Sequence, residues 1–229
     1  MPKVLFKFDK EKDLWNIWET CNSDSKWYNH KESVSPILLE ICEGKKFEEC
    51  KKELEEFRSK IYNSKLIKPF VNSLQQAWDT INDRFFEKLE KIMKLPIVFD
   101  EVISYITTVN RCPYDFKENP WFMVSFFKNI LNALVTCGHE IMHIQFHNTY
   151  WDYVKKEIGE DKTAHLKEAL TVLLNSEFSK DFWFVNDEGY PVHKELRKFI
   201  EEEWKKEPDF DILLNKCIKY LKDNDVSLS

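Results

Sequence analysis

Apolar residues recur at three- and four-residue spacing through much of the chain, which predicts a mostly helical fold. In the N-terminal part this pattern predicts a short strand at 4–8, followed by helices over 10–21, 36–42, 47–62 and 66–93. Pro36 at the start of the second helix and Gly44 just after its end are residues typical of helix boundaries. The polar stretch 22–35 is expected to be a loop.

The pattern changes after Pro96. Segments 103–109 and 121–126 are rich in β-branched or aromatic residues and predict two strands. Helical spacing then returns over 128–147, 162–178, 192–206 and 210–221. We therefore predict an α+β fold, mostly helical, with a small sheet beside the helix at 128–147.

The change of pattern near residue 95 also suggests how the chain is organised. We divide it into a helical N-terminal region, 1–95, and a second domain, 96–229. The N-terminal region matches no motif, and we consider scaffold, lid and prosegment as its possible roles. Neither internal repeats nor low-complexity segments occur.

Composition agrees with a folded, helix-rich protein. Of 229 residues, 43% are hydrophobic and 32% charged, enough to bury a core. Only 4 Gly and 8 Pro are present, which argues against a β-sandwich with many tight turns. The balance of 34 basic against 40 acidic residues gives a net charge of −6, which provides no electrostatic reason to expect nucleic acid or an anionic membrane as a partner.

The sequence pattern also bears on location. The apolar stretch at the N-terminus is interrupted by Lys7, so it is not the core of a signal peptide. The long apolar region 121–146 contains Lys128, His139 and Glu140, which excludes a membrane span. Six cysteines are scattered without a CxxC pair. We therefore expect reduced thiols in a cytoplasmic protein.

One segment carries specific chemistry, the HExxH motif His139-Glu140-Ile141-Met142-His143. On a helix, His139 and His143 share a face and are about 6 Å apart along the axis, so both imidazoles can bind one Zn²⁺. Glu140 borders that face and can take a proton from a metal-bound water as general base. Gly138, costly inside a helix by about 1 kcal/mol, suggests close approach by neighbouring backbone.

Catalytic zinc normally has three protein ligands, so a third must come from elsewhere. Glu168 is the best candidate, since it stands beside Ala169 in an apolar helix that can approach the HExxH helix closely. His165, one turn earlier, is an alternative. His147 is another, although on a straight helix it lies about 12 Å from His139 along the axis.

The HExxH motif followed by a helical Glu-Ala resembles the gluzincin branch of zinc metallopeptidases, including small cytoplasmic peptidases that cleave phage-type repressors. The resemblance covers residues 120–180. It implies a zincin-like fold, His139, His143 and Glu168 as zinc ligands and Glu140 as general base. It also implies that the strand at 121–126 is an edge strand along which an extended peptide lies. Lys167 stands where this family usually has Asn.

The resemblance further implies a hydrogen-bond donor for the oxyanion that forms during peptide hydrolysis. Tyr190 and His193, in the turn after the Glu168 helix, are the best candidates. Tyr150 and Tyr153, just beyond the HExxH helix, are weaker alternatives.

The sequence thus predicts a zinc-dependent metallopeptidase acting on a peptide or protein substrate. Two other interpretations stay open. In the first, the chain is a regulatory or interaction protein whose zinc site is structural or vestigial. In the second, it is a metal-free helical protein in which the motif is accidental.

Overall fold

The computed structural model describes residues 1–23, 29–179 and 181–224. These ranges contain four strands, β1 (Lys3–Phe8), β2 (Glu101–Thr107), β3 (Tyr114–Asp115) and β4 (Trp121–Ser125). They also contain ten α-helices: α1 (Lys10–Asn22), α2 (Pro36–Cys42), α3 (Phe47–Tyr62), α4 (Ile67–Asp79), α5 (Asn82–Met93), α6 (Ile130–Thr149), α7 (Trp151–Leu170), α8 (Val172–Phe178), α9 (Lys194–Lys206) and α10 (Phe210–Asp223). Short 3₁₀ helices lie at His30–Ser33 (η1) and Pro191–His193 (η2). The predicted α+β fold, mostly helical with a small sheet, is confirmed.

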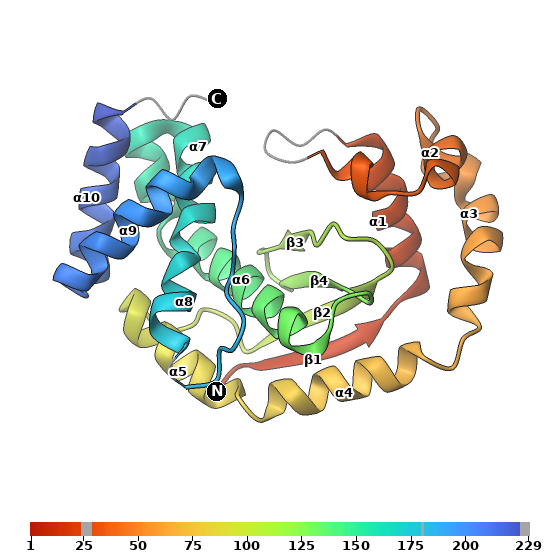
Figure 1. Ribbon diagram of the computed structural model, residues 1–229, viewed down its shortest axis with the longest axis horizontal. Coiled ribbons are helices and arrows are strands. Elements are labelled where there is room, and N and C mark those ends of the chain that lie inside the picture. Colours follow the sequence, from red (N-terminus) through yellow and green to blue (C-terminus); the bar gives the residue numbers. More distant parts are fainter. Residues whose placement is uncertain (24–28, 180, 225–229) are drawn as a thin grey trace.

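The four strands form one mixed sheet in the order β1-β2-β4-β3 (Figure 1). β1 pairs with β2 in parallel, with Val4 opposite Val102, and β2 pairs with β4 in parallel, with Ser104 opposite Phe122. Alternate residues of β1 and β2 are buried, as expected for strands that cover a core with one face. The sheet combines a strand from region 1–95 with three later strands, and the division near residue 95 stays a prediction.

The expectation that the strand at 121–126 lies at the sheet edge is wrong. β3 pairs antiparallel with β4, with Tyr114 opposite Phe122 and Asp115 opposite Trp121. The edge strand on this side is therefore β3, beside α6. Two residues are too few to produce a periodic pattern, so no alternation of apolar and polar residues could indicate this strand.

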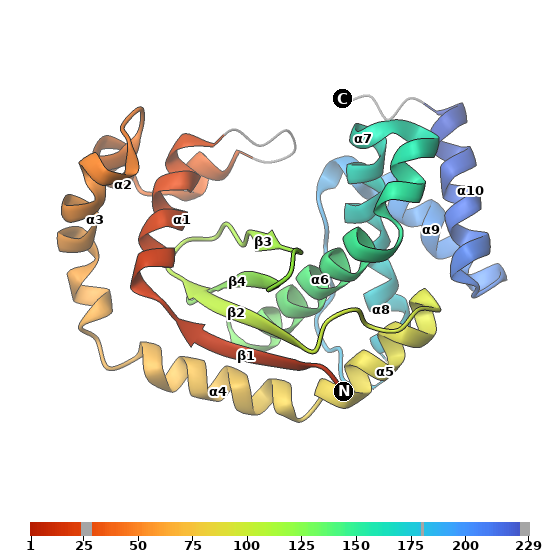
Figure 2. The same cartoon turned by 180° about the vertical axis from the view of Figure 1, so that it is seen from behind.

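Two groups of helices flank the sheet at opposite ends, α1–α3 at one end and α7–α10 at the other (Figures 1 and 2). α4 packs along β1, and α6 packs against β4 and α7. The larger apolar core, around Trp78 and Phe85, joins the sheet to α4–α10. A smaller core, around Leu14, Cys42 and Leu54, joins α1–α3.

The predicted single helix over 66–93 is wrong, because it divides into α4 and α5 at Thr80 and Ile81. The Thr80 hydroxyl donates to the carbonyl of Ala77, and the Trp78 indole N–H donates to the side chain of Asn82. The break turns α5 away from β1 and towards α10. It preserves the apolar spacing, so periodicity alone could not reveal it.

The predicted helix over 162–178 also has different bounds. α7 begins at Trp151 and contains a non-helical residue, Gly159, whose φ of 79° suits glycine. α7 ends at Leu170, and α8 follows after Thr171. The candidate third ligand, Glu168, is therefore in the last turn of α7.

α6 is buried along most of its length and begins at a cap in which the Asn129 side chain accepts from the N–H of Asn132. The close approach expected at Gly138 is present, but it comes from side chains rather than backbone. A Cβ at this position would lie 2.5 Å from Cη2 of Trp183 and 3.0 Å from Cε2 of Phe85. Across residues 1–23, 29–179 and 181–224, no helix has the length and apolarity needed to cross a membrane.

Candidate metal centre

α6 presents the HExxH residues on one face, as their spacing predicts. The ring centroids of His139 and His143 are 4.3 Å apart. His143 and Glu140 are nearly inaccessible, with 1% and 6% of their surface exposed. Because α6 is packed on several sides, these side chains have little freedom to move.

Glu168 completes the group from α7. Its Oε2 lies 3.2 Å from Nε2 of His143 and 3.4 Å from Nε2 of His139. Two ligands that bind one Zn²⁺ at about 2.0–2.1 Å with tetrahedral angles are about 3.3 Å apart. Both distances from Glu168 match this spacing, and the three ligand atoms all lie within 4.8 Å of one another, so the group could hold a metal ion. No other group of this kind occurs in the part of the chain that the structure describes.

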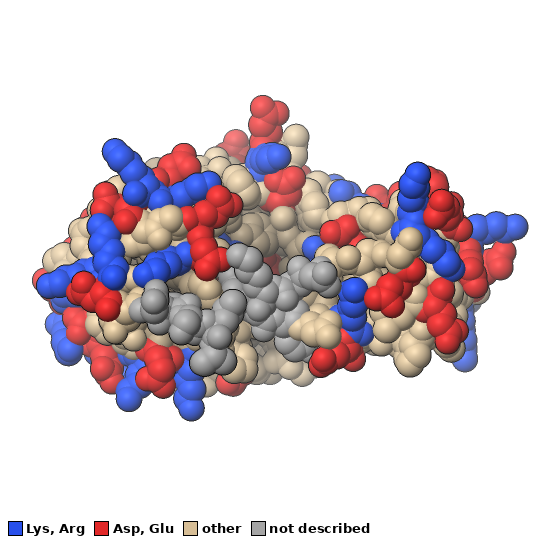
Figure 3. All heavy atoms as spheres, turned by 90° about the horizontal axis from the view of Figure 1, so that it is seen from above, with Lys and Arg blue, Asp and Glu red and all other residues tan. Residues whose placement is uncertain are grey.

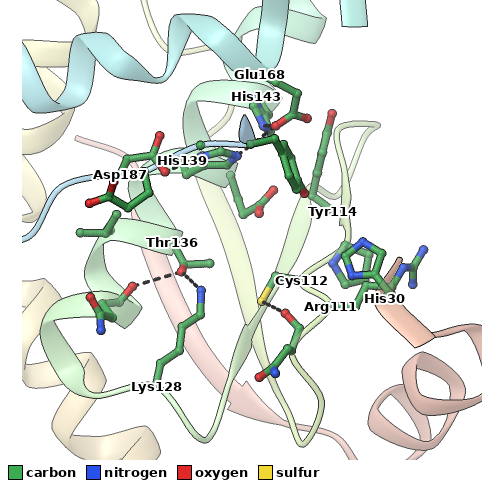
Figure 4. A pocket seen from close by; sticks show the side chains of 18 of the residues that line it. His30, Arg111, Cys112, Tyr114, Lys128, Thr136, His139, His143, Glu168 and Asp187 are labelled. Atoms are coloured by element: carbon green, nitrogen blue, oxygen red, sulfur yellow. Dashed lines mark hydrogen bonds and ion pairs between the residues drawn. The ribbon is translucent and has the colours of Figure 1, made fainter. Parts of the chain in front are cut away.

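Asp187 holds His139 from the side opposite Glu168. Its Oδ1 lies 3.1 Å from Nδ1 of His139. Its Oδ2 accepts a hydrogen bond from Thr171 at 2.6 Å and faces Nη1 of Arg197 at 3.2 Å. This contact fixes the imidazole so that Nε2 points at Glu168, the arrangement commonly found around metal-binding histidines. Figure 4 shows His139 between Asp187 and the pair His143 and Glu168.

Lys167 contacts the other oxygen of Glu168. Its Nζ lies 2.8 Å from Oε1 of Glu168 and donates to the Tyr114 hydroxyl at 2.7 Å, and the lysine is buried. One carboxylate oxygen is thus occupied by an ammonium, and the other faces the two histidines. The arrangement suits Glu168 as a ligand through Oε2 alone.

The two alternative third ligands are occupied elsewhere. Nε2 of His147 lies 2.9 Å from the hydroxyl of Tyr114, and its ring stacks on Phe116 and Trp151. Nδ1 of His165 lies 2.9 Å from Nε2 of His193 in a buried pair. Neither His147 nor His165 belongs to the group formed by the two motif histidines and Glu168.

The candidate centre opens into a cavity of about 710 Å³. Its walls come from Ser23 and His30 of the N-terminal region, segment 110–114, Lys128 and one side of α6, Glu168 of α7, and segment 186–190. The N-terminal region therefore contributes part of the cavity wall. The face in Figure 3 is hollowed near its centre, and basic and acidic side chains are intermixed around it.

The sequence-predicted oxyanion donors differ in position. Tyr190 lines the cavity together with the three candidate ligands. His193 is fully buried, pairs with His165 and is not part of the cavity lining. Tyr150 and Tyr153 do not line the cavity. The Tyr150 hydroxyl donates to the carbonyl of Met93, and the Tyr153 hydroxyl donates to the side chain of Asn215.

The electrostatics of the metal-free site follow from burial and from the charges that face one another. Burial, together with the negative charge of Glu168 and against the charge of His139, raises the pKa of Glu140 to about 7. Burial also lowers the pKa of His143 to about 3, assisted by the charge of Lys167. His143 is therefore neutral at pH 7, the form that binds a metal.

Glu168 and His139 behave differently, because opposite charges outweigh burial. Burial raises the pKa of Glu168, but His143 and Lys167 lower it, so that it lies well below its usual value. Burial lowers the pKa of His139, but the charge and hydrogen bond of Asp187 raise it to about 10. Glu168 is thus an anion at neutral pH, and a metal must displace a proton from His139.

Sequence reasoning missed Asp187, Tyr114 and the role of Lys167. Asp187 lies in an irregular segment whose fold depends on Gly189 and Arg197: Gly189 has a φ of 65°, and a Cβ there would lie 2.6 Å from Nη1 of Arg197. Tyr114 lies on the two-residue strand β3. The one available indication was Lys167, a charged residue in an otherwise apolar stretch of helix.

Comparison with known proteins gives no assignment: no protein-family model matches the chain, and no curated protein or solved structure matches it significantly.

Proposed function

We propose that this chain is a zinc-dependent metallopeptidase of the gluzincin type, acting on a peptide or protein substrate. The observation that carries the proposal is the position of Glu168 Oε2, within 3.4 Å of Nε2 of both His139 and His143. Two neutral imidazoles and one carboxylate form a common ligand set of catalytic zinc in hydrolases. The site also opens into a cavity, as a catalytic centre requires and a purely structural zinc site does not.

Zinc bound by these three side chains would supply an acidified water and polarise the carbonyl of the scissile bond. The Glu140 carboxylate, one residue after the first ligand and facing the same cavity, takes a proton from the attacking water and delivers it to the leaving amine. A side chain with a pKa near 7 is well suited to both steps.

Tyr190 is the residue we assign to stabilise the negative charge on the former carbonyl oxygen, because it lines the same cavity as Glu140. His193 does not line the cavity, and its pair with His165 instead connects the segment around Tyr190 to α7. An extended peptide lies along segment 110–114, which includes the start of edge strand β3.

The test begins with zinc content per chain, measured by elemental mass spectrometry on wild type and on His139→Ala and Glu168→Ala. We expect about one zinc in wild type and loss in both variants. Glu140→Gln should retain zinc and lose hydrolysis of a peptide library. Zinc without hydrolysis in wild type would favour the alternative, a non-catalytic zinc-binding protein. Unchanged hydrolysis in Glu140→Gln would refute the mechanism.

A further inference from the structure

The cavity has two electrostatically different ends. The candidate metal centre, with Glu140 and Glu168, is at one end. At the other end, away from Glu168, the lining contains Lys128, just before α6, and Arg111, just before β3. Figure 4 shows these two side chains on opposite sides of the cavity, with Cys112 between them and the metal centre beyond.

The position of Lys128 is fixed by α6 itself. Its ammonium donates a hydrogen bond to Oγ1 of Thr136, which in turn donates to the carbonyl of Asn132. Thr136 is four residues before Glu140, so the ammonium is held beside the turn of α6 that precedes the general base. Lys128 forms no ion pair with a carboxylate among the residues that the structure describes.

Arg111 is held on the facing wall. Its Nη1 donates to Oδ1 of Asn16 at 3.0 Å, and the amide of Asn16 donates to the carbonyl of Arg111 at 2.9 Å. Asn16 is fully buried in α1, so this anchor is rigid. Burial raises the pKa of the Cys112 thiol, and the charges of Lys128 and Arg111 both lower it, which agrees with their positions on either side of this residue. In the described part of the chain, no carboxylate lies within ion-pair distance of Arg111, although the charge of Glu19 raises the pKa of its guanidinium against the effect of burial.

Two cations held by neutral side chains in a cavity favour an anion from outside, because a partly desolvated charge without a partner is costly. The acidic groups of the cavity do not fill this role. Glu168 and Asp187 are engaged at the metal centre, Glu188 is exposed at the rim, and Glu140 lies one turn away. A carboxylate has the chemistry that these side chains recognise, since it accepts hydrogen bonds from ammonium and from guanidinium groups.

We propose that Lys128 and Arg111 form a carboxylate-binding subsite that makes this enzyme select substrates with a carboxylate close to the scissile bond. The inference rests on the proposed peptidase function. Because Lys128 is held beside the turn of α6 before Glu140, the carboxylate that it binds belongs to a residue close to the cleaved bond. The carboxylate is either an Asp or Glu side chain or a free C-terminus.

The first experiment compares hydrolysis of acetylated, amidated peptides that carry a single Glu or Gln at each position around the cleavage site. A third set has neutral side chains and a free C-terminal carboxylate. We expect kcat/KM to be at least about tenfold higher for one Glu peptide than for its Gln partner, or for the free-carboxylate peptide than for its amide. A preference for a Glu peptide over its Gln partner assigns the carboxylate to a side chain. A preference for the free-carboxylate peptide over its amide assigns it to the C-terminus.

Variants then test the residues. Lys128→Met should reduce the ratio of kcat/KM between the Glu and Gln peptides towards one. Lys128→Glu should make the enzyme prefer Lys over Glu at the same position. Arg111→Gln should reduce the preference. Lys156→Met, on an exposed face of α7, is the matched control and should leave the preference unchanged. Zinc content and melting temperature establish that each variant is folded.

A binding experiment separates this inference from the proposed function. In the Glu140→Gln background, fluorescence anisotropy gives Kd for labelled Glu and Gln peptides with and without Lys128→Met. Tighter binding of the Glu peptide, lost in Lys128→Met, supports the subsite even if wild type hydrolyses nothing. Equal Kd values, or a preference that survives both Lys128→Met and Arg111→Gln, would overturn the subsite and leave the peptidase proposal standing.

Discussion

Asp187 and His139 are 48 residues apart in the chain, yet Oδ1 of Asp187 lies 3.1 Å from Nδ1 of His139. The carboxylate is itself held by Thr171 and Arg197. This chain of contacts connects the segment after α8 to the HExxH helix and determines which imidazole nitrogen faces Glu168. The metal centre therefore depends on residues outside its three candidate ligands.

The first prediction concerns Asp187→Asn. The amide still accepts a hydrogen bond from His139 but lacks the negative charge that makes the imidazole a better ligand. We expect zinc affinity to fall about 10–100-fold. Competition with a zinc chelator measures this. Asp152→Asn, at an exposed position of α7, is the control, and an affinity equal to that of wild type would show that Asp187 has no part in metal binding.

The second prediction concerns Lys167→Met. Removing the buried ammonium leaves Oε1 of Glu168 without its ionic partner, and the metal-free protein should lose about 3 kcal/mol of unfolding free energy. The pKa of Glu168 should rise, because one of the charges that lower it is gone. On acidification, zinc affinity should then begin to decrease at a higher pH than in wild type. An identical pH dependence in both proteins would contradict the role of Lys167.

The third prediction concerns the stability of the metal-free protein. The pKa of Glu140 is about 7 in the fold, against 4.5 as its ordinary value, so the folded form binds a proton more strongly than the unfolded form. Its charged form therefore destabilises the fold, increasingly as the pH rises from 4.5 to 7. Each pKa unit corresponds to about 1.4 kcal/mol. Glu140→Gln should stabilise the chelator-treated protein by up to about 3 kcal/mol at pH 8.

Because the destabilisation is absent when the carboxyl is protonated, the same substitution should have little effect at pH 4. Urea unfolding at both pH values measures the difference. Glu53→Gln, an exposed position of α3, is the control and should change little at either pH. Equal stability of wild type and Glu140→Gln at pH 8 would show that the buried carboxyl is not destabilising.

The fourth prediction concerns Gly138→Ala. A methyl group would lie 2.5 Å from the Trp183 indole and 3.0 Å from the Phe85 ring, so the aromatic cluster behind α6 must shift. Overpacking of this kind costs about 1–3 kcal/mol, which exceeds the gain in helix propensity from Gly to Ala. Thermal unfolding should give a lower melting temperature, whereas Ser73→Ala on the exposed face of α4 should not. A higher melting temperature would contradict the packing.

How far the sequence predicted this structure depends on how local each feature is. The helices 36–42 and 47–62 were predicted with their observed bounds, since each has its own apolar spacing and boundary residues. The break between α4 and α5 was missed, because the hydrogen bonds of Thr80 and Trp78 with their neighbours leave no trace in the spacing of apolar residues. The edge strand β3 was missed because its pairing partner, β4, defines it.

The sequence by itself determined that His139 and His143 lie on one helical face beside Glu140, because four-residue spacing has the same geometry in every α-helix. It also predicted Glu168 as the third candidate ligand, because Glu168 is an acidic residue in an apolar helix. Only the tertiary structure decided which atoms converge. The packing of α7 on α6 brings Glu168 to both imidazoles, the segment after α8 brings Asp187 to His139, and β3 brings Tyr114 to Lys167. Such contacts join residues far apart in the chain, and no local pattern encodes them.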